Sequence, residues 1–320
     1  MTKKMKTTIA VVSALVIGIG GFTFFNKSKK EEPKKDKLRV ALILDEGGVN
    51  DQSFNQSAWE GALRSKDKHQ IEVSYLESTK EADYITNIDT AVDNDSDLIV
   101  GIGYKMKNAI AESADNYPDQ KFVIIDEVVE KDNVISITFN EEQSGYLVGL
   151  IAGEMTETNK LGFIGGQEVP TVTRFYDGFI KGIKEVNPKA EVSIQFANSF
   201  TDSAKGKAIA QQMISKNMDI IFTAGGGVNS GVFEICKETN TYAIGVDSPS
   251  SHIAPEVILT SALKNVGSGI EMTIDDVVNG TFQGGKHIVY DMSTPAIDFE
   301  RTNLIPKDII EEVEKIKENK

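Results

Sequence analysis

Apolar and polar positions alternate along the chain in a way that predicts short strands separated by helices. From residue 38 onward, apolar runs that fit strands lie at 38–44 and 71–76, and helical spacing follows them at 53–65 and 80–94. Strands of Val, Ile and Leu that alternate with helices are typical of a parallel sheet covered on both faces, with right-handed crossovers. The chain is therefore predicted to have an α/β fold.

The same alternation continues through the rest of the sequence and restarts once. Further strands are predicted at 98–100, 122–125, 135–139, 161–164, 191–196, 220–222, 242–246 and 258–261. Further helices are predicted at 106–116, 141–155, 175–186, 204–216, 231–238, 266–279 and 307–318. A new series of strands begins at residue 160, which marks a domain boundary and predicts two related sheets. A length of 320 residues also fits two domains.

The first 37 residues depart from this pattern and predict a membrane-targeting segment followed by a charged linker. Residues 7–25 carry no charge, and lysines lie on both sides of them. An uncharged run of about 19 residues is long enough to span a bilayer as a helix, and no small-x-small cleavage site follows it. We therefore predict an uncleaved anchor in the cell membrane, with the globular domain on the extracytoplasmic side. The linker at 26–37 has Pro33 among mixed charges.

Charge and cysteine content narrow the classes of partner. Residues 38–320 carry a net charge of −20. Such an acidic domain repels the phosphates of nucleic acids, so no nucleic-acid partner is expected. Cys236 is the one cysteine in the sequence, so no disulfide can form within the chain, and no cysteine near the N-terminus could carry a lipid. A lone thiol is most often simply buried.

The stretch at 45–61, which reads DEGGVNDQSFNQSAWEG, is the first candidate for ligand recognition. It connects a predicted strand to a predicted helix, so it lies at the carboxyl edge of a parallel sheet, where open α/β sheets bind ligands. It holds two carboxylates and an amide beside an aromatic residue: Asp45, Asp51, Asn55 and Phe54. Two interpretations of Phe54 stay open: it contacts a ligand, or it packs at the helix start as a hydrophobic staple.

Other polar or aromatic residues also follow predicted strands. Asp126 comes directly after 122–125, where it is either a ligand-binding residue at the same edge or an ordinary turn residue. In the second half, strands end near Phe200, Phe222 and Asp247. If the two sheets meet edge to edge, these residues face a shared cleft, a common kind of ligand site. Aromatic rings can stack on a planar base, and a carboxylate can accept hydrogen bonds from a ribose.

Glycines and a lysine near these strand ends allow more than one interpretation. Gly225, Gly226 and Gly227 follow a strand, precede a helix and are followed about 20 positions later by Asp247, which imitates a dinucleotide-binding fingerprint. The spacing is GxGxxxG rather than GxGxxG, so a dinucleotide-dependent oxidoreductase is the weaker alternative. Lys264 either donates to a bound sugar or orients Asp247, or it is an ordinary surface lysine in the first turn of a helix.

Signatures of catalysis are otherwise missing from the sequence. His69, His252 and His287 are scattered without the paired spacing of a metal site. No GxSxG nucleophile elbow is present. The sequence is therefore predicted to encode a binding protein that is not an enzyme and uses no cofactor or metal.

Several long stretches together resemble the basic membrane protein family of purine-nucleoside-binding lipoproteins. These are DEGGVNDQSFNQSAWEG, NVISITFNEEQSGYLVGLIAGEMTETNKLGFIGG, SFTDSAKGKAIAQQM, IIFTAGGGVNSGVFE and YAIGVDS. Members of this family are substrate-binding components of ABC transporters. The resemblance implies a type I periplasmic-binding-protein fold, with two Rossmann-like lobes, three crossovers, a hinge and a ligand cleft between the lobes. The lobes are predicted at 38–158 plus 258–280 and at 159–257 plus 281–320.

The resemblance also implies roles for particular residues. Phe54 and Phe222 resemble the family's stacking aromatics, with Phe200 as the alternative to Phe222. Asp126 resembles the residue that binds the base edge, assisted by Asp45 and Asn55. Asp51 is a further candidate for ligand binding in the same stretch. The family's contacts to the ribose correspond, by resemblance, to Asp247, Lys264 and the backbone of Gly225, Gly226 and Gly227.

The implied function is extracytoplasmic binding of a purine nucleoside (adenosine, guanosine or inosine) by a monomer that delivers it to an ABC permease for uptake. One departure is the missing lipobox cysteine, which leaves the N-terminal segment as the predicted attachment to the membrane. A membrane-tethered nucleoside sensor or regulatory protein is the alternative. A regulatory relative in the family lacks the Ser-Phe-Asn stretch. This chain has it as Ser53, Phe54 and Asn55, which favours a transport role over a regulatory one.

Overall fold

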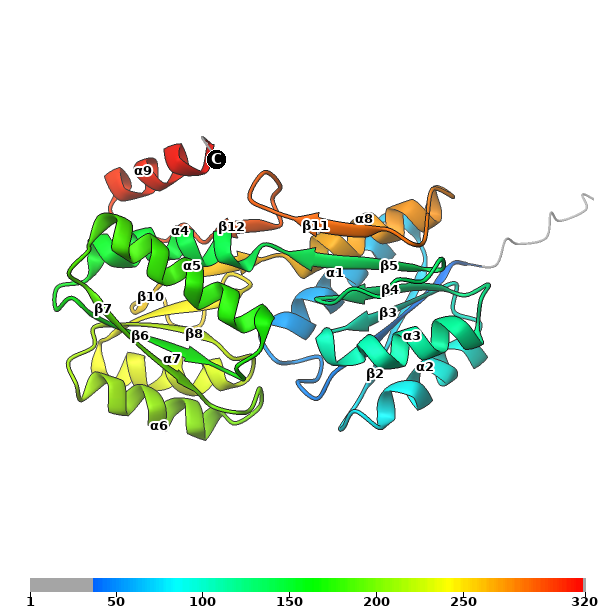
Figure 1. Cartoon of the computed structure of the whole chain (residues 1–320), viewed down its shortest axis with the longest axis horizontal. Helices are drawn as coiled ribbons and strands as arrows, with labels where there is room; N and C mark the ends of the chain where they lie inside the picture. The colour runs from blue at the N-terminus through cyan, green and yellow to red at the C-terminus, as the bar shows by residue number, and fades with distance from the viewer. Residues whose placement is uncertain (1–36, 319–320) are drawn as a thin grey trace, which may run out of the picture. The chain divides into compact units, whose positions relative to one another are not determined.

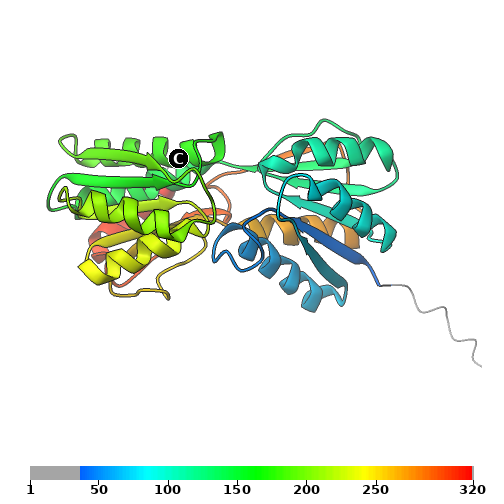
Figure 2. The same ribbon diagram turned by 90° about the horizontal axis from the view of Figure 1, so that it is seen from below.

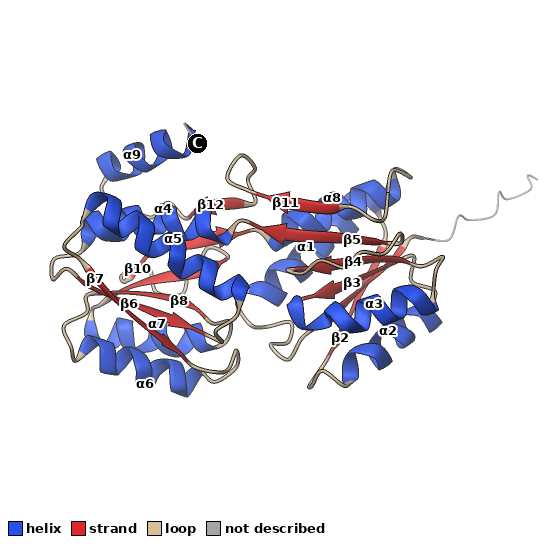
Figure 3. Cartoon of the chain, in the orientation of Figure 1, coloured by secondary structure: helices blue, strands red, loops and turns tan. Residues whose placement is uncertain are grey.

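The computed structural model describes residues 37–318 (Figure 1). The predicted membrane-targeting segment at 7–25 therefore lies outside the described residues. Among the residues that are described, no helix is long and apolar enough to cross a membrane. These residues form two six-stranded sheets, each covered by helices on both faces (Figures 2 and 3).

The first sheet is parallel throughout, as the alternating pattern predicts. Its strand order is β11-β5-β4-β3-β1-β2. The strands are β1 (Arg39–Leu44), β2 (Glu72–Glu77), β3 (Leu98–Ile102), β4 (Lys121–Ile125), β5 (Val134–Phe139) and β11 (His287–Tyr290).

The second sheet repeats this arrangement with one antiparallel strand at its edge. Its order is β12-β10-β9-β8-β6-β7, and β12 runs antiparallel to β10. The strands are β6 (Lys160–Gly165), β7 (Glu191–Phe196), β8 (Ile220–Ala224), β9 (Tyr242–Asp247), β10 (Ile258–Lys264) and β12 (Ile297–Phe299).

Helices cover both faces of each sheet, which is why central strands read as unbroken apolar runs. The helices are α1 (Phe54–His69), α2 (Asp83–Asp93), α3 (Lys107–Asn116, after a 3-10 turn at Tyr104–Met106), α4 (Glu141–Met155), α5 (Pro170–Val186), α6 (Ser203–Ile214), α7 (Val228–Thr239), α8 (Val266–Val278) and α9 (Lys307–Glu318). In β1, Leu42 joins the core formed with α1 and α8, whereas its neighbour Ile43 joins the core formed with α2 and α3. Both faces of the strand are therefore buried.

In the second sheet, α4, α5 and α9 cover one face and α6 and α7 the other. The pair α4 and α5 packs so closely that a Cβ on Gly178 would lie 1.9 Å from the carbonyl oxygen of Glu142. Only glycine permits this approach, which fixes the beginning of α4 against α5. This matters for the site described below, because Glu141 and Arg174 belong to these two helices.

The chain passes between the sheets three times, after β5, after β10 and after β11. This confirms the predicted type I fold with three crossovers. The predicted lobe boundaries differ from the observed sheets, because β10 pairs with β9 in the second sheet and β11 pairs with β5 in the first. An alternating pattern predicts that a strand exists but not which of two sheets it joins. The short strands β11 and β12 were missing from the prediction altogether.

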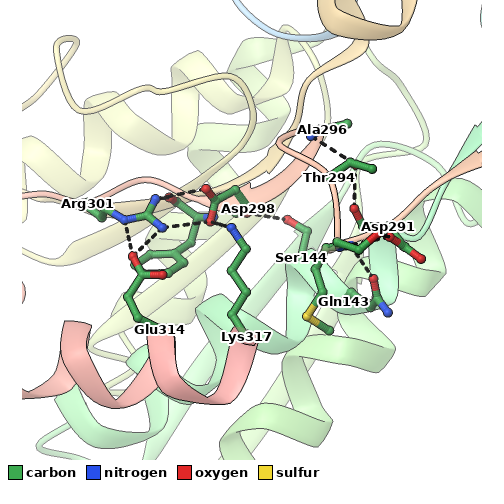
Figure 4. Close-up of polar contacts among 12 residues, drawn as sticks. Gln143, Ser144, Asp291, Thr294, Ala296, Asp298, Arg301, Glu314 and Lys317 are labelled. Atoms are coloured by element: carbon green, nitrogen blue, oxygen red, sulfur yellow. Dashed lines mark hydrogen bonds and ion pairs between the residues drawn. The ribbon is translucent and has the colours of Figure 1, made fainter. Parts of the chain in front are cut away.

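The third crossing is held in place by polar contacts with α4 and α9 (Figure 4). The backbone N–H of Met292 donates to Gln143 Oε1 at 2.8 Å, and Ser144 Oγ donates to the carbonyl oxygen of Asp298. Lys317 of α9 pairs with the Asp298 carboxylate at 2.9 Å. Both ends of this crossing are therefore anchored to the helices of the second sheet.

Candidate functional site

A cavity lies at the carboxyl ends of strands from both sheets. Its empty space, counted together with open solvent at the mouth, is about 620 Å³. Ten of the residues predicted from the sequence line it, namely Asp45, Asp51, Phe54, Asn55, Asp126, Phe200, Gly225, Gly226, Asp247 and Lys264. The remaining lining residues are Gly47, Gly103, Tyr104, Thr171, Val172, Phe175, Ala224 and Val246.

The prediction of Phe222 as a stacking residue is wrong. Phe222 is fully buried, and its ring packs edge to face against Phe163 and Phe179, with centroids 5.2 and 5.1 Å away. It lies within β8 rather than after it, so its side chain joins the core under α4 and α5. The aromatic residues that line the cavity from this half of the chain are Phe175 and Phe200. Sequence reasoning missed Phe175 because it occupies an apolar position of an amphipathic helix.

Gly227 does not line the cavity either. It occupies the N-cap position of α7, and its N–H donates to the carbonyl oxygen of Phe200 at 2.8 Å. This bond connects the Phe200 loop to the glycine turn, so Gly227 positions the loop. Its neighbours Gly225 and Gly226 do line the cavity.

The loop before α1 is organised by Asp51. Its carboxylate accepts backbone N–H groups of Ser53, Asn55 and Gln56 at 2.9, 2.8 and 3.0 Å. These donors are the otherwise unpaired N–H groups of a helix start. The side-chain amide of Asn55 donates to Asp45 Oδ1 at 2.7 Å and to Asp51 Oδ2 at 3.2 Å. Burial raises the pKa of both Asp45 and Asp51, and these hydrogen bonds oppose the rise.

Lys264 is buried in a chain of charges that spans both sheets. Its Nζ atom lies 2.5 Å from Asp126 Oδ2 and 3.1 Å from Glu141 Oε1. Arg174 in turn pairs with Glu141 at 2.7 Å. Only 2% of the Lys264 side chain is exposed, so the interpretation as a surface lysine is wrong. Its partner is Asp126 rather than Asp247, which it was expected to orient.

The charges around Lys264 determine its state. Burial alone would lower its pKa, but Asp126, Glu141 and Asp247 raise it well above the ordinary value, so the side chain stays protonated. The ammonium also lies 5.1 Å from the ring centroid of Phe54, within cation–π range. Glu141 and Arg174 were missed by sequence reasoning, because nothing in their spacing shows that they meet Lys264.

Asp126 and Asp247 have the same unusual backbone conformation. Their φ angles are 71° and 64°, in the left-handed region that Asp tolerates better than most residues. Ser53 Oγ donates to Asp247 Oδ2 at 2.5 Å, which links the start of α1 to the second sheet. Desolvation raises the pKa of Asp126 to about 6 and that of Asp247 to about 7, although Lys264 opposes both shifts. Strained backbone and perturbed carboxyl groups in one cavity are typical of a functional site.

Two acceptors in this cavity are left without partners. Asn55 Oδ1 and Asp126 Oδ1 are buried and accept no hydrogen bond from any described residue. Such groups cost free energy until a donor reaches them. In the part of the chain that the structure describes, no cluster of His, Cys, Asp or Glu could hold a metal ion. The two unpaired acceptors and the ring of Phe54 in one cavity are suited to a ligand that has hydrogen-bond donors and a flat ring.

Comparison with known proteins identifies the family. Residues 37–320 match the model of the Bmp family, described as ABC transporter substrate-binding protein PnrA-like. The chain belongs to the Bmp family. It is therefore an ABC transporter substrate-binding protein, and the family resemblance noted in the sequence is confirmed.

Relatives of this chain match it over nearly its whole length. The chain is 37% identical to the CD4+ T-cell-stimulating antigen of Listeria innocua, over 99% of this chain and 95% of that protein. It is 34% identical to the ABC transporter nucleoside-binding protein BmpA of Lactococcus lactis, over 95% and 93%. It is also 34% identical to basic membrane protein A of Borreliella burgdorferi, over 94% and 89%.

Solved structures share the fold of this chain. An ABC transporter solute-binding protein from Aeropyrum pernix superposes with a TM-score of 0.78 at 26% identity, covering 88% of this chain and 86% of that one. A transcriptional activator of the comK gene from Bacillus halodurans shares the fold, with a TM-score of 0.77 at 24% identity over 88% and 96%.

Replacing Lys264 by Met should destabilise the folded protein by about 3–5 kcal/mol, because Asp126 and Glu141 would remain buried without their shared cation. Chemical denaturation without ligand at pH 7 measures this loss. Lys181→Met is the matched control, because Lys181 pairs with Glu142 on the surface, where the two side chains are 62% and 46% exposed. The control should lose no more than about 1 kcal/mol. Equal losses would contradict the structural role of Lys264.

The stability of the ligand-free protein should fall as the pH rises from about 4 to about 7. In this window Asp247 is protonated in the folded state, where its pKa is about 7, but ionised in the unfolded chain. Asp126 contributes in the same direction at slightly lower pH, because its pKa is raised to about 6. The stabilising contribution is fully present below pH 4 and is lost as the pH passes 7.

Asp247→Asn isolates the contribution of Asp247. The free energy of unfolding of the wild-type protein minus that of the variant should decrease steadily between pH 4.5 and 7.5, measured by urea denaturation at several pH values. A difference that stays constant across this range would show that Asp247 has an ordinary pKa in the folded protein.

Proposed function

We propose that this protein binds purine nucleosides in the cavity between its two sheets and delivers them to an ABC permease for uptake. The observation that supports the proposal most is the lining of the cavity, which includes the aromatic Phe54 and the unpaired acceptors of Asn55 and Asp126. A flat base with N–H donors satisfies both features. Asp247 lines the same cavity and accepts hydrogen bonds from the ribose hydroxyls.

The relatives support the same ligand class. The Lactococcus lactis relative is named a nucleoside-binding protein, and the chain covers almost its full length. In the proposed role the protein acts as a monomer on the extracytoplasmic side, held at the membrane by its N-terminal segment. Phe175 and Phe200 take the part that the sequence prediction assigned to Phe222, because they line the cavity on the side of the second sheet.

Thermal unfolding of the full-length protein with a panel of ligands tests the proposal directly. Adenosine, guanosine or inosine should raise the midpoint, because a ligand that binds only the folded state adds about 2.7 kcal/mol of stability at a hundredfold excess over Kd. Ribose and NAD should leave the midpoint unchanged. A shift with NAD and none with nucleosides would instead support the oxidoreductase alternative, and no shift with any ligand would overturn the proposed function.

Phe54→Ala should weaken nucleoside binding by roughly 5- to 150-fold, because it removes one base stack worth about 1–3 kcal/mol. Isothermal titration with the strongest ligand of the panel measures the change in Kd. Tyr75→Ala is the control, because Tyr75 is an exposed aromatic residue that packs on Trp59 and does not line the cavity. Similar affinities for wild type and Phe54→Ala would place the base elsewhere.

A further inference from the structure

The side-chain amide of Asn55 lies where two carboxylates converge. Its Nδ2 atom is 2.7 Å from Asp45 Oδ1 and 3.2 Å from Asp51 Oδ2. Ionised carboxylates only accept hydrogen bonds, and the amide nitrogen only donates. The nitrogen must therefore face the carboxylates, and the amide oxygen must point away from them. The assignment of the two amide atoms follows from this network.

The two carboxylates are themselves held in place. The Asp51 oxygens accept the backbone N–H groups at the start of α1, and Asp45 Oδ1 accepts the N–H of Gly47 at 2.9 Å. If the side-chain amide of Asn55 rotated by 180°, Nδ2 would lose both hydrogen bonds. Oδ1 would then face the carboxylate oxygens of Asp45 and Asp51, which repel it. Gly47 leaves room for the amide, since a Cβ there would lie 2.8 Å from Nδ2. The orientation of the amide is thus fixed by the loop.

This orientation determines what Asn55 can offer a ligand. Its nitrogen is occupied, so the remaining group is Oδ1, a buried acceptor without a partner among the described residues. Asp126 contributes a second buried acceptor of this kind, Oδ1, because its other oxygen is held by Lys264. Both residues line the cavity. A ligand that fills it therefore meets two acceptors and no amide donor from Asn55.

We propose that Asp45 and Asp51, by holding the Asn55 amide as an acceptor, make the site selective for bases that present two N–H donors along one edge. This inference rests on the proposed nucleoside-binding function. Guanine has such an edge, with its N1–H and its 2-amino group. Hypoxanthine has only the N1–H, and adenine places an acceptor, N1, beside its amino group. The expected order of affinity is therefore guanosine, then inosine, then adenosine.

Titration of the full-length protein with single nucleosides tests this order. Guanosine should bind at least about tenfold more tightly than adenosine, the scale of a well-placed pair of hydrogen bonds. 1-Methylguanosine, which lacks the N1–H, should lose most of that advantage. Equal affinities for guanosine and adenosine would overturn the selectivity while leaving nucleoside binding intact. Failure of every nucleoside to bind would instead overturn the proposed function, and with it this inference.

Asp45→Asn tests the role of the carboxylate. An amide at position 45 can donate as well as accept, so only Asp51 still holds the Asn55 nitrogen and the amide is less firmly oriented. The preference for guanosine over adenosine should therefore shrink to a few-fold. Glu46→Gln is the matched control, because it removes one negative charge at the adjacent position. Glu46 contacts Tyr84 and Lys105 rather than Asn55. The control should keep the wild-type preference.

A folded Asp45→Asn protein with the wild-type preference would show that the carboxylate does not orient the amide. If the variant does not fold, the affinities of the wild-type protein for guanosine and 1-methylguanosine decide the question. Equal affinities would show that the site does not recognise the N1–H donor.

Discussion

The buried ammonium group of Lys264 ties together three parts of the chain that meet at the cavity. A charge in such a place loses its hydration, at a cost of several kcal/mol, and is tolerated only with close partners of opposite sign. Asp126 supplies one from the end of β4 in the first sheet, and Glu141 supplies another from the first residue of α4. Arg174 of α5 completes the pairing of Glu141. The ends of β4 and β10 and the start of α4 are therefore positioned together.

The ends of the strands position the other polar groups of the cavity. In a parallel sheet, all strands end at the same edge, so Asp45 and Asp126 of the first sheet come together although they are far apart in sequence. Asp247 ends β9 of the second sheet and lines the same cavity. Asp126 and Asp247 also turn the chain sharply through the left-handed region. This conformation costs free energy for most residues, and the surrounding hydrogen bonds must maintain it. The fold and the site thus depend on the same few residues.

The sequence was sufficient to predict residues whose position follows from a strand end. Asp45, Asp126 and Asp247 follow or finish apolar runs, and Phe54 begins the helix after one. Phe222 was misplaced because it belongs to the strand itself, where alternate side chains face the core. Phe175 could not be found, since a cavity residue and a core residue look alike on an amphipathic helix. Such distinctions depend on three-dimensional packing.

Contacts between residues far apart in the sequence could not be predicted from the sequence pattern either. The pairing of Lys264 with Glu141 joins residues that lie on different elements, and no local pattern marks either as a partner of the other. The same holds for the sheet membership of β10 and β11, which depends on where the chain crosses between sheets. Local propensity predicts helices and strands, whereas burial and charge determine which strands and which charged residues pair.

The charge balance of the cavity also bears on the form of its ligand. Four aspartates line it, Asp45, Asp51, Asp126 and Asp247, against the single cation of Lys264. Burial raises the pKa of each of these carboxyl groups, which lowers their negative charge but provides no positive charge. A phosphate group would have to compete with these carboxylates for Lys264, which is already paired. An uncharged ligand would bring donors to the acceptors without this repulsion, so the electrostatics favour the nucleosides of the proposed function over nucleotides.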